Sequence, residues 1–419
     1  MSTGTIKYET KRIPRLRFAG FSEEWQQKKL GSIFSKQQKR NSENKHECIL
    51  TNSASRGIVK QSDYFNKDIA NRNNLTNYFI VDIDDFIYNP RISKHAPVGP
   101  LKRNNLEKGI VSPLYTILKL RKGNSIFFET YFDTNKWHRY MYKIANYGAR
   151  HDRMNILQND FLAMPVSFPH ILEQQKIAKF LRAIEKLHNN LLREKELLEI
   201  YKKGVMQKIF SQEIRFKNNN GREFPEWNEK SMSEIGESFN GLTGKRGEDF
   251  GSGESFITYK QIFDDSEINI DKFSLVKISV DEKQNKTQFG DVFFTTSSET
   301  PLEVGFASVL LDKNITPYLN SFSFGFRPNS LKECNPYYTR FFFRSSIFRR
   351  EVVKLAQGST RYNISKFSFM KIKIRIPSFL EQQKIAEFLT PIDNLINLKQ
   401  KQIVQTKEWR KGLMQGLFI

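Results

Sequence analysis

The order of apolar and polar residues predicts a half-buried β-strand near the end of the chain. In "FMKIKIRIP" (369–377) the two kinds of residue alternate, which places every second side chain on one face of a strand. The apolar face carries Met370, Ile372, Ile374 and Ile376. An earlier segment, "FLAMPVSFP" (161–169), alternates in the same way, with Leu162, Met164, Val166 and Phe168 on one face. We therefore expect two equivalent strands, each ended by a proline.

After each of these prolines the apolar spacing changes to that of a helix. In the first segment, apolar residues recur at every seventh position: Ile177, Ile184, Leu191, Leu198 and Val205. In the second segment, the matching places hold Ile385, Phe388, Ile392, Leu395, Trp409 and Leu413. A seven-residue apolar repeat is typical of a coiled coil, here about four heptads long.

The sequence "LTPID" (389–393) places Thr390, Pro391 and Asp393 as they stand at the start of a helix. We therefore expect a short helix to end there and a long helix to begin near Pro391. The equivalent break in the first segment would fall near Arg182 or Ala183, and a single kinked helix is the alternative. Glu173 and Glu381 are expected to be first-turn acids that suit a helix N-terminus.

These two segments are copies of one sequence. Residues 169–210 align with residues 377–418 at an offset of 208 without a gap, and 18 of the 42 positions are identical. The same offset pairs Arg153, Asn155 and Ile156 with Arg361, Asn363 and Ile364. Near the start of each half, an offset of 202 pairs Trp25, Leu30 and Ile33 with Trp227, Met232 and Ile235. An internal repeat of this kind means that the chain contains two copies of one structural plan.

The repeat predicts four regions: a globular domain at 1–168, a helical region at 169–212, a second globular domain at 213–376 and a second helical region at 377–419. Each globular stretch has a mixed α/β (α+β) composition and an ordinary domain size. Strands are expected in "DFIYN" (85–89), "IVSPLYTILKL" (110–120), "GDVFFTT" (290–296) and "SFSFGF" (321–326), and a helix at 338–355. Tyr88, Phe294 and the three phenylalanines at 341–343 are expected in the cores rather than on bases.

The charge of the chain favours a polyanionic ligand. The 419 residues contain 67 Lys and Arg against 45 Asp and Glu, a net charge of +22 and a pI near 9.7. Nucleic acid is the usual target of such a surplus, and an anionic membrane surface or a charge that serves solubility are the alternatives. There is no apolar run long enough to cross a membrane, no secretory leader pattern, and no pairing motif around Cys48 or Cys334. These features predict a cytoplasmic protein.

Catalytic and cofactor motifs are missing from the sequence. The glycine-rich stretch "GLTGKRGEDFGSGES" (241–255) lacks the spacing of a P-loop, and no GxGxxG follows a predicted strand. "YNPR" (88–91) only partly matches an amino-methyltransferase motif, and the six histidines form no metal-binding spacing. We therefore expect neither a catalytic residue nor a bound metal in this chain.

The repeated segments resemble those of the specificity subunits of type I restriction–modification systems. The resemblance rests on "LEQQKIAKFL" and "LEQQKIAEFL" after a strand-ending proline, the heptads that follow, the "KGVMQ" and "KGLMQ" exits, and the "RMNI" and "RYNI" lead-ins. It covers essentially the whole chain.

This resemblance implies that each globular stretch is a target-recognition domain for one half of a bipartite, usually asymmetric, double-stranded DNA site. It also implies that the two helical regions pair as an antiparallel coiled coil, which spaces the domains and docks modification subunits, two of them by the duplicated plan. These partners would carry S-adenosylmethionine, and restriction subunits would bring ATP and Mg. The chain itself would bind no cofactor and catalyse no reaction.

Candidate DNA contacts lie in the loops of both halves. "YGARHDRMN" (147–155) and "QGSTRYN" (357–363) combine glycine, hydroxyl, arginine and asparagine groups that suit phosphate or base contacts. The matched Arg and Asn are expected to share a common task, either DNA contact or the holding of a turn. The full set is Arg91, Lys94, Lys102, Arg103, Arg150, Arg153, Asn155, Lys245, Arg246, Ser359, Thr360, Arg361 and Asn363.

Candidate coiled-coil or docking residues come from the repeated helices. They are Gln174, Gln175, Ile177, Ile184, Leu191, Leu198, Gln382, Gln383, Ile385, Ile392 and Leu395. The glutamines are expected to be solvated turns or partner contacts. Two rival interpretations stay open at this point: a stand-alone DNA methyltransferase or nuclease, and a coiled-coil interaction protein whose basic charge is incidental.

Overall fold

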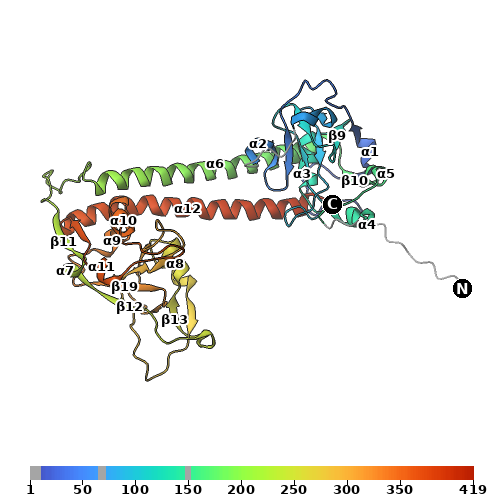
Figure 1. Cartoon of the computed structure of the whole chain (residues 1–419). Helices are drawn as coiled ribbons and strands as arrows, with labels where there is room; N and C mark the ends of the chain where they lie inside the picture. Colours follow the sequence, from blue (N-terminus) through green and yellow to red (C-terminus); the bar gives the residue numbers. More distant parts are fainter. Residues whose placement is uncertain (1–10, 65–71, 147–151) are drawn as a thin grey trace. The chain divides into compact units, whose positions relative to one another are not determined.

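The computed structural model describes residues 11–64, 72–146 and 152–419 of the chain. It divides into two compact units, which we call unit 1 (residues up to Leu191, together with Gln402–Ile419) and unit 2 (Leu192–Lys401). Both boundaries fall inside long helices, α6 (Ile171–Phe210) and α12 (Phe379–Leu417), which are labelled in Figure 1. Each unit therefore consists of a globular part and one segment from each long helix.

Unit 1 is built on a four-stranded antiparallel sheet in the order β2-β9-β6-β7. Three strand pairs surround it, β1-β10, β3-β4 and β5-β8. The strands are β1 (Gln26–Lys29), β2 (Phe34–Gln37), β3 (Leu50–Ser53), β4 (Gly57–Lys60), β5 (Phe79–Val81), β6 (Phe86–Tyr88), β7 (Leu101–Arg103), β8 (Gly109–Val111), β9 (Thr116–Leu120) and β10 (Pro165–Phe168). The short helices are α1 (Leu30–Ile33), α2 (Gln61–Tyr64), α3 (Ser125–Phe132), α4 (His138–Ile144) and α5 (Gln158–Leu162), with a 3-10 helix at Arg72–Asn77.

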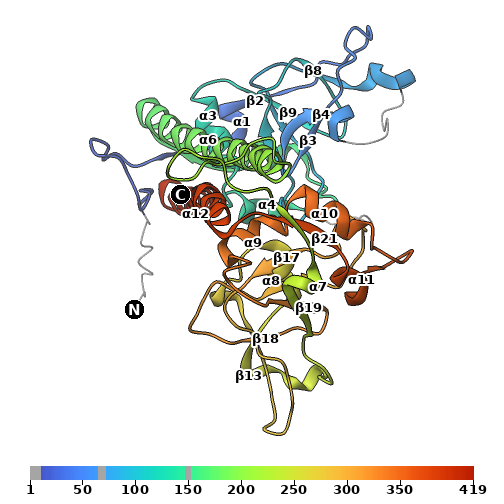
Figure 2. The ribbon, with the colours of Figure 1, turned by 90° about the vertical axis from the view of Figure 1, so that its left-hand side faces the viewer.

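Unit 2 repeats this sheet in the order β12-β19-β15-β17. It adds the sheet β14-β13-β18 and the pairs β11-β21 and β16-β20. The strands are β11 (Asn228–Ser231), β12 (Gly236–Asn240), β13 (Phe250–Ile257), β14 (Ser274–Val276), β15 (Val292–Thr295), β16 (Ser297–Ser298), β17 (Ala307–Val309), β18 (Tyr318–Leu319), β19 (Ser323–Pro328), β20 (Tyr362–Asn363) and β21 (Lys373–Ile376). Figure 2 shows β17 and β19 among the short helices α7 (Met232–Ile235), α8 (Tyr259–Asp264), α9 (Pro336–Phe342), α10 (Ser346–Val353) and α11 (Lys366–Met370); the 3-10 helices are Gly247–Asp249 and Ile270–Lys272.

The main core of each unit contains residues from both long helices. In unit 1, Ile177 and Ile184 of α6 and Leu417 of α12 join a cluster around Trp25 and Phe127. In unit 2, Met206 of α6 and Ile385 of α12 join a cluster around Trp227 and Phe294. Apolar contacts of this extent resist separation of the globular part from the helices. The aromatic residues predicted as core, Tyr88, Phe294 and residues 341–343, are confirmed as buried.

The two helices run antiparallel. In unit 2, Glu194 pairs with Lys399 at 2.6 Å, and Lys202, two turns later on α6, pairs with Asp393. In unit 1, the Phe180 and Trp409 rings meet edge to face with centroids 6.1 Å apart. The predicted antiparallel helical pair is therefore present, and its two helices are contributed by the two repeated segments.

The predicted break at Pro391 is wrong, because α12 continues through this residue and α6 continues through Arg182 and Ala183. Proline in a helix removes one hydrogen bond and costs about 3 kcal/mol. Pro391 is exposed to solvent, so water can satisfy the carbonyl that lacks a partner. Burial of Leu389 before it and Ile396 after it stabilises both sides of the interruption.

Three other predicted elements are shorter than expected. The strand at 369–377 starts at Lys373, and Phe369 and Met370 belong to α11. The helix at 338–355 is two helices, because the Ser345 hydroxyl accepts a hydrogen bond from the Phe348 amide and caps the second one. The strand at 110–120 is also two, β8 and β9, with a turn at Ser112–Tyr115 between them.

The predicted seam of α6 is correct in unit 1, but Trp409 of α12 in the same unit is 51% exposed, and the seam is displaced in unit 2. Ile177, Ile184 and Leu191 are buried, whereas Leu198 is half-buried. On α12, Ile385 is buried and Ile392 half-buried, but Leu395 is 40% exposed and Ile396 is buried in its place. The 3.6-residue period of a straight helix drifts from a strict seven-residue repeat, and this drift changes the residue that faces the partner helix.

Candidate nucleic-acid interface

A buried ion pair joins the start of α6 to the segment before β1 in unit 1. The carboxylate of Glu173, which is 1% exposed, accepts hydrogen bonds from the Arg17 guanidinium, 2.9 Å from Nε and 2.8 Å from Nη2. A bidentate bond fixes the orientation of both groups. Glu173 is a first-turn acid as predicted, but its role is to hold the preceding segment against the helix.

The same ion pair occurs in unit 2. The fully buried carboxylate of Glu381 accepts from Arg215, at 3.2 Å from Nε and 2.9 Å from Nη2, and also from the Trp227 indole nitrogen at 3.1 Å. Arg215 donates further to the carbonyls of Phe224 and Pro225. We call Arg17–Glu173 and Arg215–Glu381 the anchor pairs.

The residue after each anchor arginine packs on the adjoining helix. Phe18 lies edge to face with Phe180, and Phe216 is tilted against Phe388, with centroids 5.4 Å and 5.5 Å apart. Just before each arginine, a backbone bond joins the segment to the end of the other long helix. These bonds run from the Leu16 amide to the Gly416 carbonyl and from the Ile214 amide to the Lys208 carbonyl. The anchoring segments of the two units are therefore equivalent.

Gln174 and Gln382 are buried within the units, which corrects the expectation of solvated turns or partner contacts. The Gln174 side chain accepts from the Asn124 amide and donates to the Pro169 carbonyl. Gln382 accepts from the Asn335 amide and donates to the Pro377 and Glu333 carbonyls. The two backbone amides that donate to these glutamines belong to the N-cap residues of α3 and α9. Each glutamine therefore joins a helix of the globular part to a long helix. Gln175 is exposed and Gln383 is half-buried.

The two matched loops are closed by backbone bonds at corresponding positions. Asn155 exchanges hydrogen bonds with Asn146, and Asn363 exchanges them with Gln357, with N···O distances between 2.8 and 3.3 Å. Both asparagines are exposed. The backbone of each asparagine thus holds the loop closed, while its side chain stays accessible.

The loops differ in what they present between these closing bonds. In unit 2, Ser359, Thr360 and Arg361 are exposed, and the Arg361 guanidinium lies 6.0 Å from the centre of the exposed Phe322 ring. In unit 1, Arg153 is half-buried, 4.0 Å from the Asp152 carboxylate. Arg150, another candidate, lies outside the described residues.

Arg91 and Lys94 lie on one exposed segment of unit 1. The Arg91 backbone forms a bridge with Arg153, so this segment adjoins the matched loop. Its guanidinium stands 3.6 Å from Asp152 and remains largely exposed. Within the described part of the chain, the Lys94 ammonium has no ion pair or hydrogen bond. Both side chains are accessible to a ligand.

Two candidates of β7 are engaged in ion pairs. Arg103 is 7% exposed and pairs with Glu129 at 2.7 Å and with Asp84 at 2.5 Å. Burial alone lowers its pKa, but the hydrogen bonds to these carboxylates outweigh burial and raise it. Arg103 as a DNA contact is therefore a wrong assignment, since its guanidinium cannot reach a ligand. Lys102 is half-buried and pairs with Asp133.

The glycine-rich stretch of unit 2 contains one engaged and one accessible cation. The Lys245 ammonium pairs with Glu282 at 2.5 Å and donates to the Lys277 carbonyl, and its side chain is 5% exposed. Lys245 therefore stabilises the loop rather than facing DNA. Arg246 is exposed, and its amide is bonded to Asp249.

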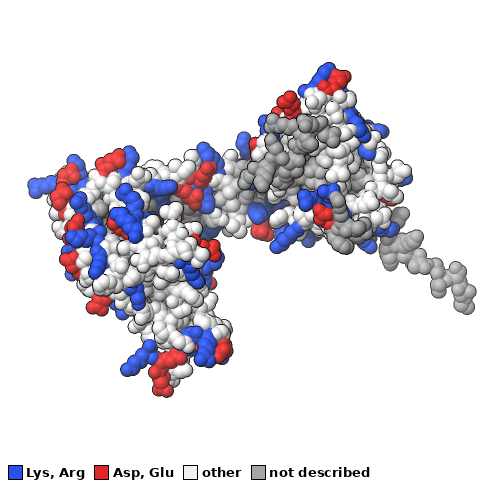
Figure 3. Space-filling view, viewed as in Figure 1, with Lys and Arg blue, Asp and Glu red and all other residues white. Residues whose placement is uncertain are grey.

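On the face drawn in Figure 3, Lys and Arg side chains are scattered over both units, with Asp and Glu among them. The accessible candidates after these corrections are Arg91, Lys94, Asn155, Arg246, Ser359, Thr360, Arg361 and Asn363. Among the described helices, none is long and apolar enough to cross a membrane.

This arrangement defines a protein with two similar globular units, each anchored to an antiparallel helix pair. A model of the family described as "Type I restriction modification DNA specificity domain" matches residues 225–408. The MjaVIII type I restriction enzyme specificity subunit of Methanocaldococcus jannaschii is 26% identical over 335 residues, which cover 74% of either chain. The putative MjaX specificity subunit of the same organism is 26% identical over 292 residues, 65% of this chain and 62% of the relative.

Two solved structures share the fold. The type I restriction–modification S subunit from M. genitalium superposes with a TM-score of 0.56 and 14% identity, over 97% of this chain and 99% of that one. A chain from a study of complex assembly and conformational transition of the type I R-M system gives a TM-score of 0.53 and 15% identity, over 94% and 96%. Over most of its length the chain is therefore similar to specificity subunits of type I restriction–modification systems.

Proposed function

We propose that this chain is a type I specificity subunit, which directs its complex to a bipartite, asymmetric site on double-stranded DNA, with one unit for each half-site. The observation that carries the proposal is that both units have the same anchor pair, buried glutamine and four-stranded sheet, while their exposed loops differ. Equal scaffolds would hold both units on DNA in the same manner. Different loop side chains would select different bases.

The accessible candidates divide into two groups under this proposal. Arg91 and Lys94 of unit 1, and Arg246 of unit 2, have no equivalent in the other half and are the candidates for base reading. Asn155 and Asn363 occur in both halves and would contact groups common to both half-sites, such as phosphates.

We also propose that the helices dock modification subunits, one for each unit and two in all. Several large apolar side chains on α6 and α12 are at least 40% exposed, and the repeat retains three of them at matched positions. Because both halves keep a large apolar side chain exposed at the same three positions, these residues are the candidates for contact with a partner protein. The matched pairs are Leu172/Leu380, Leu187/Leu395 and Tyr201/Trp409.

The chemistry would then reside on the partners. Modification subunits would carry S-adenosylmethionine, restriction subunits would use ATP and Mg, and this chain would contribute DNA recognition without catalysis, in the cytoplasm. The names of the relatives, which are specificity subunits, support this division of labour.

Methylome sequencing tests the proposal. DNA is sequenced after co-expression of this chain with its modification subunit, and the control omits this chain. A two-part methylated motif that requires this chain is expected. Unchanged methylation, with assembly of the complex demonstrated by mass measurement, would contradict the proposal and favour a protein-interaction role.

A further inference from the structure

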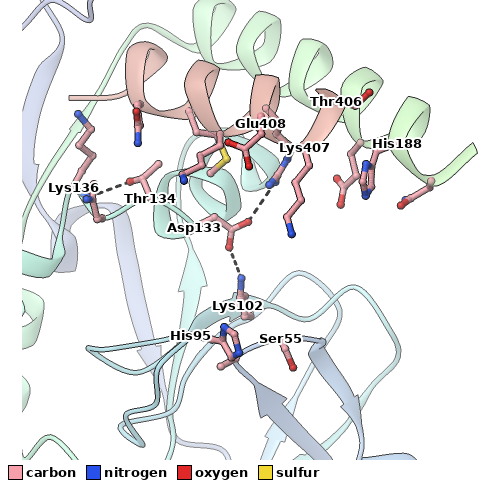
Figure 4. Close-up of a pocket in the computed structure, with 18 residues that line it drawn as sticks. Ser55, His95, Lys102, Asp133, Thr134, Lys136, His188, Thr406, Lys407 and Glu408 are labelled. Atoms are coloured by element: carbon pink, nitrogen blue, oxygen red, sulfur yellow. Dashed lines mark hydrogen bonds and ion pairs between the residues drawn. The ribbon is translucent and has the colours of Figure 1, made fainter. Parts of the chain in front are cut away.

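A large cleft in unit 1 lies between the globular part and the two long helices. It has a volume of about 1060 Å³. Figure 4 shows residues that line it. One side of the cleft is formed by the globular part, through Ser55 after β3, Lys102 of β7 and residues 133–136 after α3. His95 also lies on this side, in the segment that carries Arg91 and Lys94. The other side comes from α6 and α12, including His188 and residues 406–408. A ligand in this cleft would touch the predicted DNA-reading segment and the helices at once.

The lining of this cleft has more basic than acidic groups. Asp133 contacts both Lys102 and Arg410, with 3.7 Å to Arg410. The ammonium groups of Lys136, Lys407 and Lys411 form no ion pair with any described residue, and these lysines are exposed. In Figure 4, Lys407 extends from the helix toward the side on which Lys102, His95 and Ser55 lie. Glu185 and Glu408 also line the cleft, so its five Lys and Arg side chains exceed its three acidic ones by two. The cleft therefore offers a net positive charge to an anion.

Unit 2 has a corresponding cleft of about 520 Å³ between α6, α12 and the segment that joins α9 to α10. At the offset of 208, its helical lining matches that of the first cleft. Five matched positions have side chains of the same kind: Lys202/Arg410, Lys203/Lys411, Met206/Met414, Gln207/Gln415 and Asp393/Glu185. Two further positions differ, because Lys407 corresponds to Glu199 and His188 to Ile396.

The second cleft is also basic. Lys202 pairs with Asp393, while Lys203 is exposed and forms no ion pair with any described residue. Arg344 and Arg349 donate to backbone carbonyls rather than to carboxylates. Burial lowers the pKa of both guanidinium groups to about 10, so both remain cations at neutral pH. A cationic lining is thus common to both units, although their loops differ.

A ligand recognised by groups that both units share must itself be the same at both half-sites. The phosphodiester backbone meets this condition, since it carries a negative charge at every step and no sequence information. We propose that the two clefts bind DNA phosphates, through Lys136, Lys407 and Lys411 in unit 1 and through Lys203 in unit 2. This inference rests on the proposed function and adds a sequence-independent contact beside each reading surface.

The test is the double variant K407A/K411A in the complex assembled with modification subunits. Binding to a duplex that contains the methylated motif is measured between 50 and 200 mM salt. Each lost phosphate contact lowers the slope of log affinity against log salt by about 0.9, so a decrease of about two is expected, with affinity reduced on the order of tenfold. The motif found by methylome sequencing should stay unchanged, and K407R/K411R should retain binding.

The matched control is K179A/K186A, which removes the same charge from exposed positions of α6 in unit 1 that do not line the cleft. Equal slopes and affinities for the two double variants would overturn the proposal. Failure of K407A/K411A to assemble with modification subunits would also overturn it and identify the cleft as a protein-docking site. Failure of the proposed function looks different, because then the wild-type complex itself yields no motif.

Discussion

Units 1 and 2 have equivalent anchor pairs, but the residue before each N-cap asparagine and the length of each matched loop differ. Each anchor pair is a buried glutamate with a bidentate arginine. The residue before the N-cap asparagine differs between the units. In unit 1 it is Gly123, which has a φ of +121° and where a Cβ would lie 2.6 Å from Phe128. In unit 2 it is Cys334. The matched loops also differ in length, with eight residues between Asn146 and Asn155 and five between Gln357 and Asn363. Contacts that join the globular part to the long helices are thus the same in both units, whereas the lengths of the matched loops differ.

Removal of one anchor arginine should have the largest effect on stability. R215A leaves the buried Glu381 charge without its partner, and R17A does the same to Glu173, so each should destabilise its own unit by about 3–5 kcal/mol. Hydrogen exchange measured by mass spectrometry should show lost protection in the unit that carries the change. The double variant R215M/E381L should recover most of the loss, and equal damage from single and double variants would contradict a buried ion pair.

Trp25 and Trp227, which occupy equivalent positions in the two units, should respond differently to replacement by phenylalanine. The Trp227 indole donates to Glu381, whereas the buried Trp25 indole nitrogen has no hydrogen-bond partner among the described residues. Both W227F and W25F lose ring volume, but W227F also loses a hydrogen bond to a charged group, so it should cost about 1.5–3 kcal/mol more. Urea unfolding followed by circular dichroism measures both. Equal costs would mean that the Trp227 bond does not contribute.

Cys334 should give unit 2 a pH dependence that the glycine of unit 1 lacks. Burial raises the pKa of this thiol to about 12 from its ordinary value of 9. Between these pH values the unfolded chain releases a proton that the folded chain retains, so the free energy of unfolding falls as pH rises, by up to about 1.4 kcal/mol per pH unit. Below pH 9 this group contributes no slope. The stability difference between wild type and C334A, measured at pH 8 and pH 10, should therefore shift against the wild type, and a constant difference would contradict the burial argument.

The smallest expected effects come from substitution of single lysines, and they should differ between an exposed lysine and one that forms an ion pair. K94A removes an exposed cation and should leave thermal stability unchanged while it lowers the salt slope of DNA binding by about one. K245A removes the partner of Glu282 and should instead lower the melting temperature with little change in the salt slope. The reverse pattern would mean that the ion pair of Lys245 opens when DNA binds.

Much of the architecture follows from the sequence because repetition and periodicity are local properties. The heptads predict buried Ile177, Ile184 and Ile385, and the offset of 208 shows that two equal helical segments follow two globular stretches. The charge of +22 and the family resemblance indicate DNA recognition. The unbroken α12 was not predictable, because a proline signal is local whereas the burial of Leu389 and Ile396 on either side is not.

The tertiary structure alone decided which polar residues are available. Gln174 and Glu173 stand in a first turn where a polar residue is ordinarily solvated, and their partners, Asn124 and Arg17, are 50 and 156 residues away. The two anchor arginines are 198 residues apart in the sequence, whereas the two anchor glutamates are 208 apart. An alignment of the two halves at one fixed offset therefore cannot match both the arginines and the glutamates. Likewise Arg103 and Lys94 are equally basic in sequence, but the fold places carboxylates around the first and solvent around the second. Local pattern determines which elements form, whereas long-range contacts decide which charges remain for a ligand.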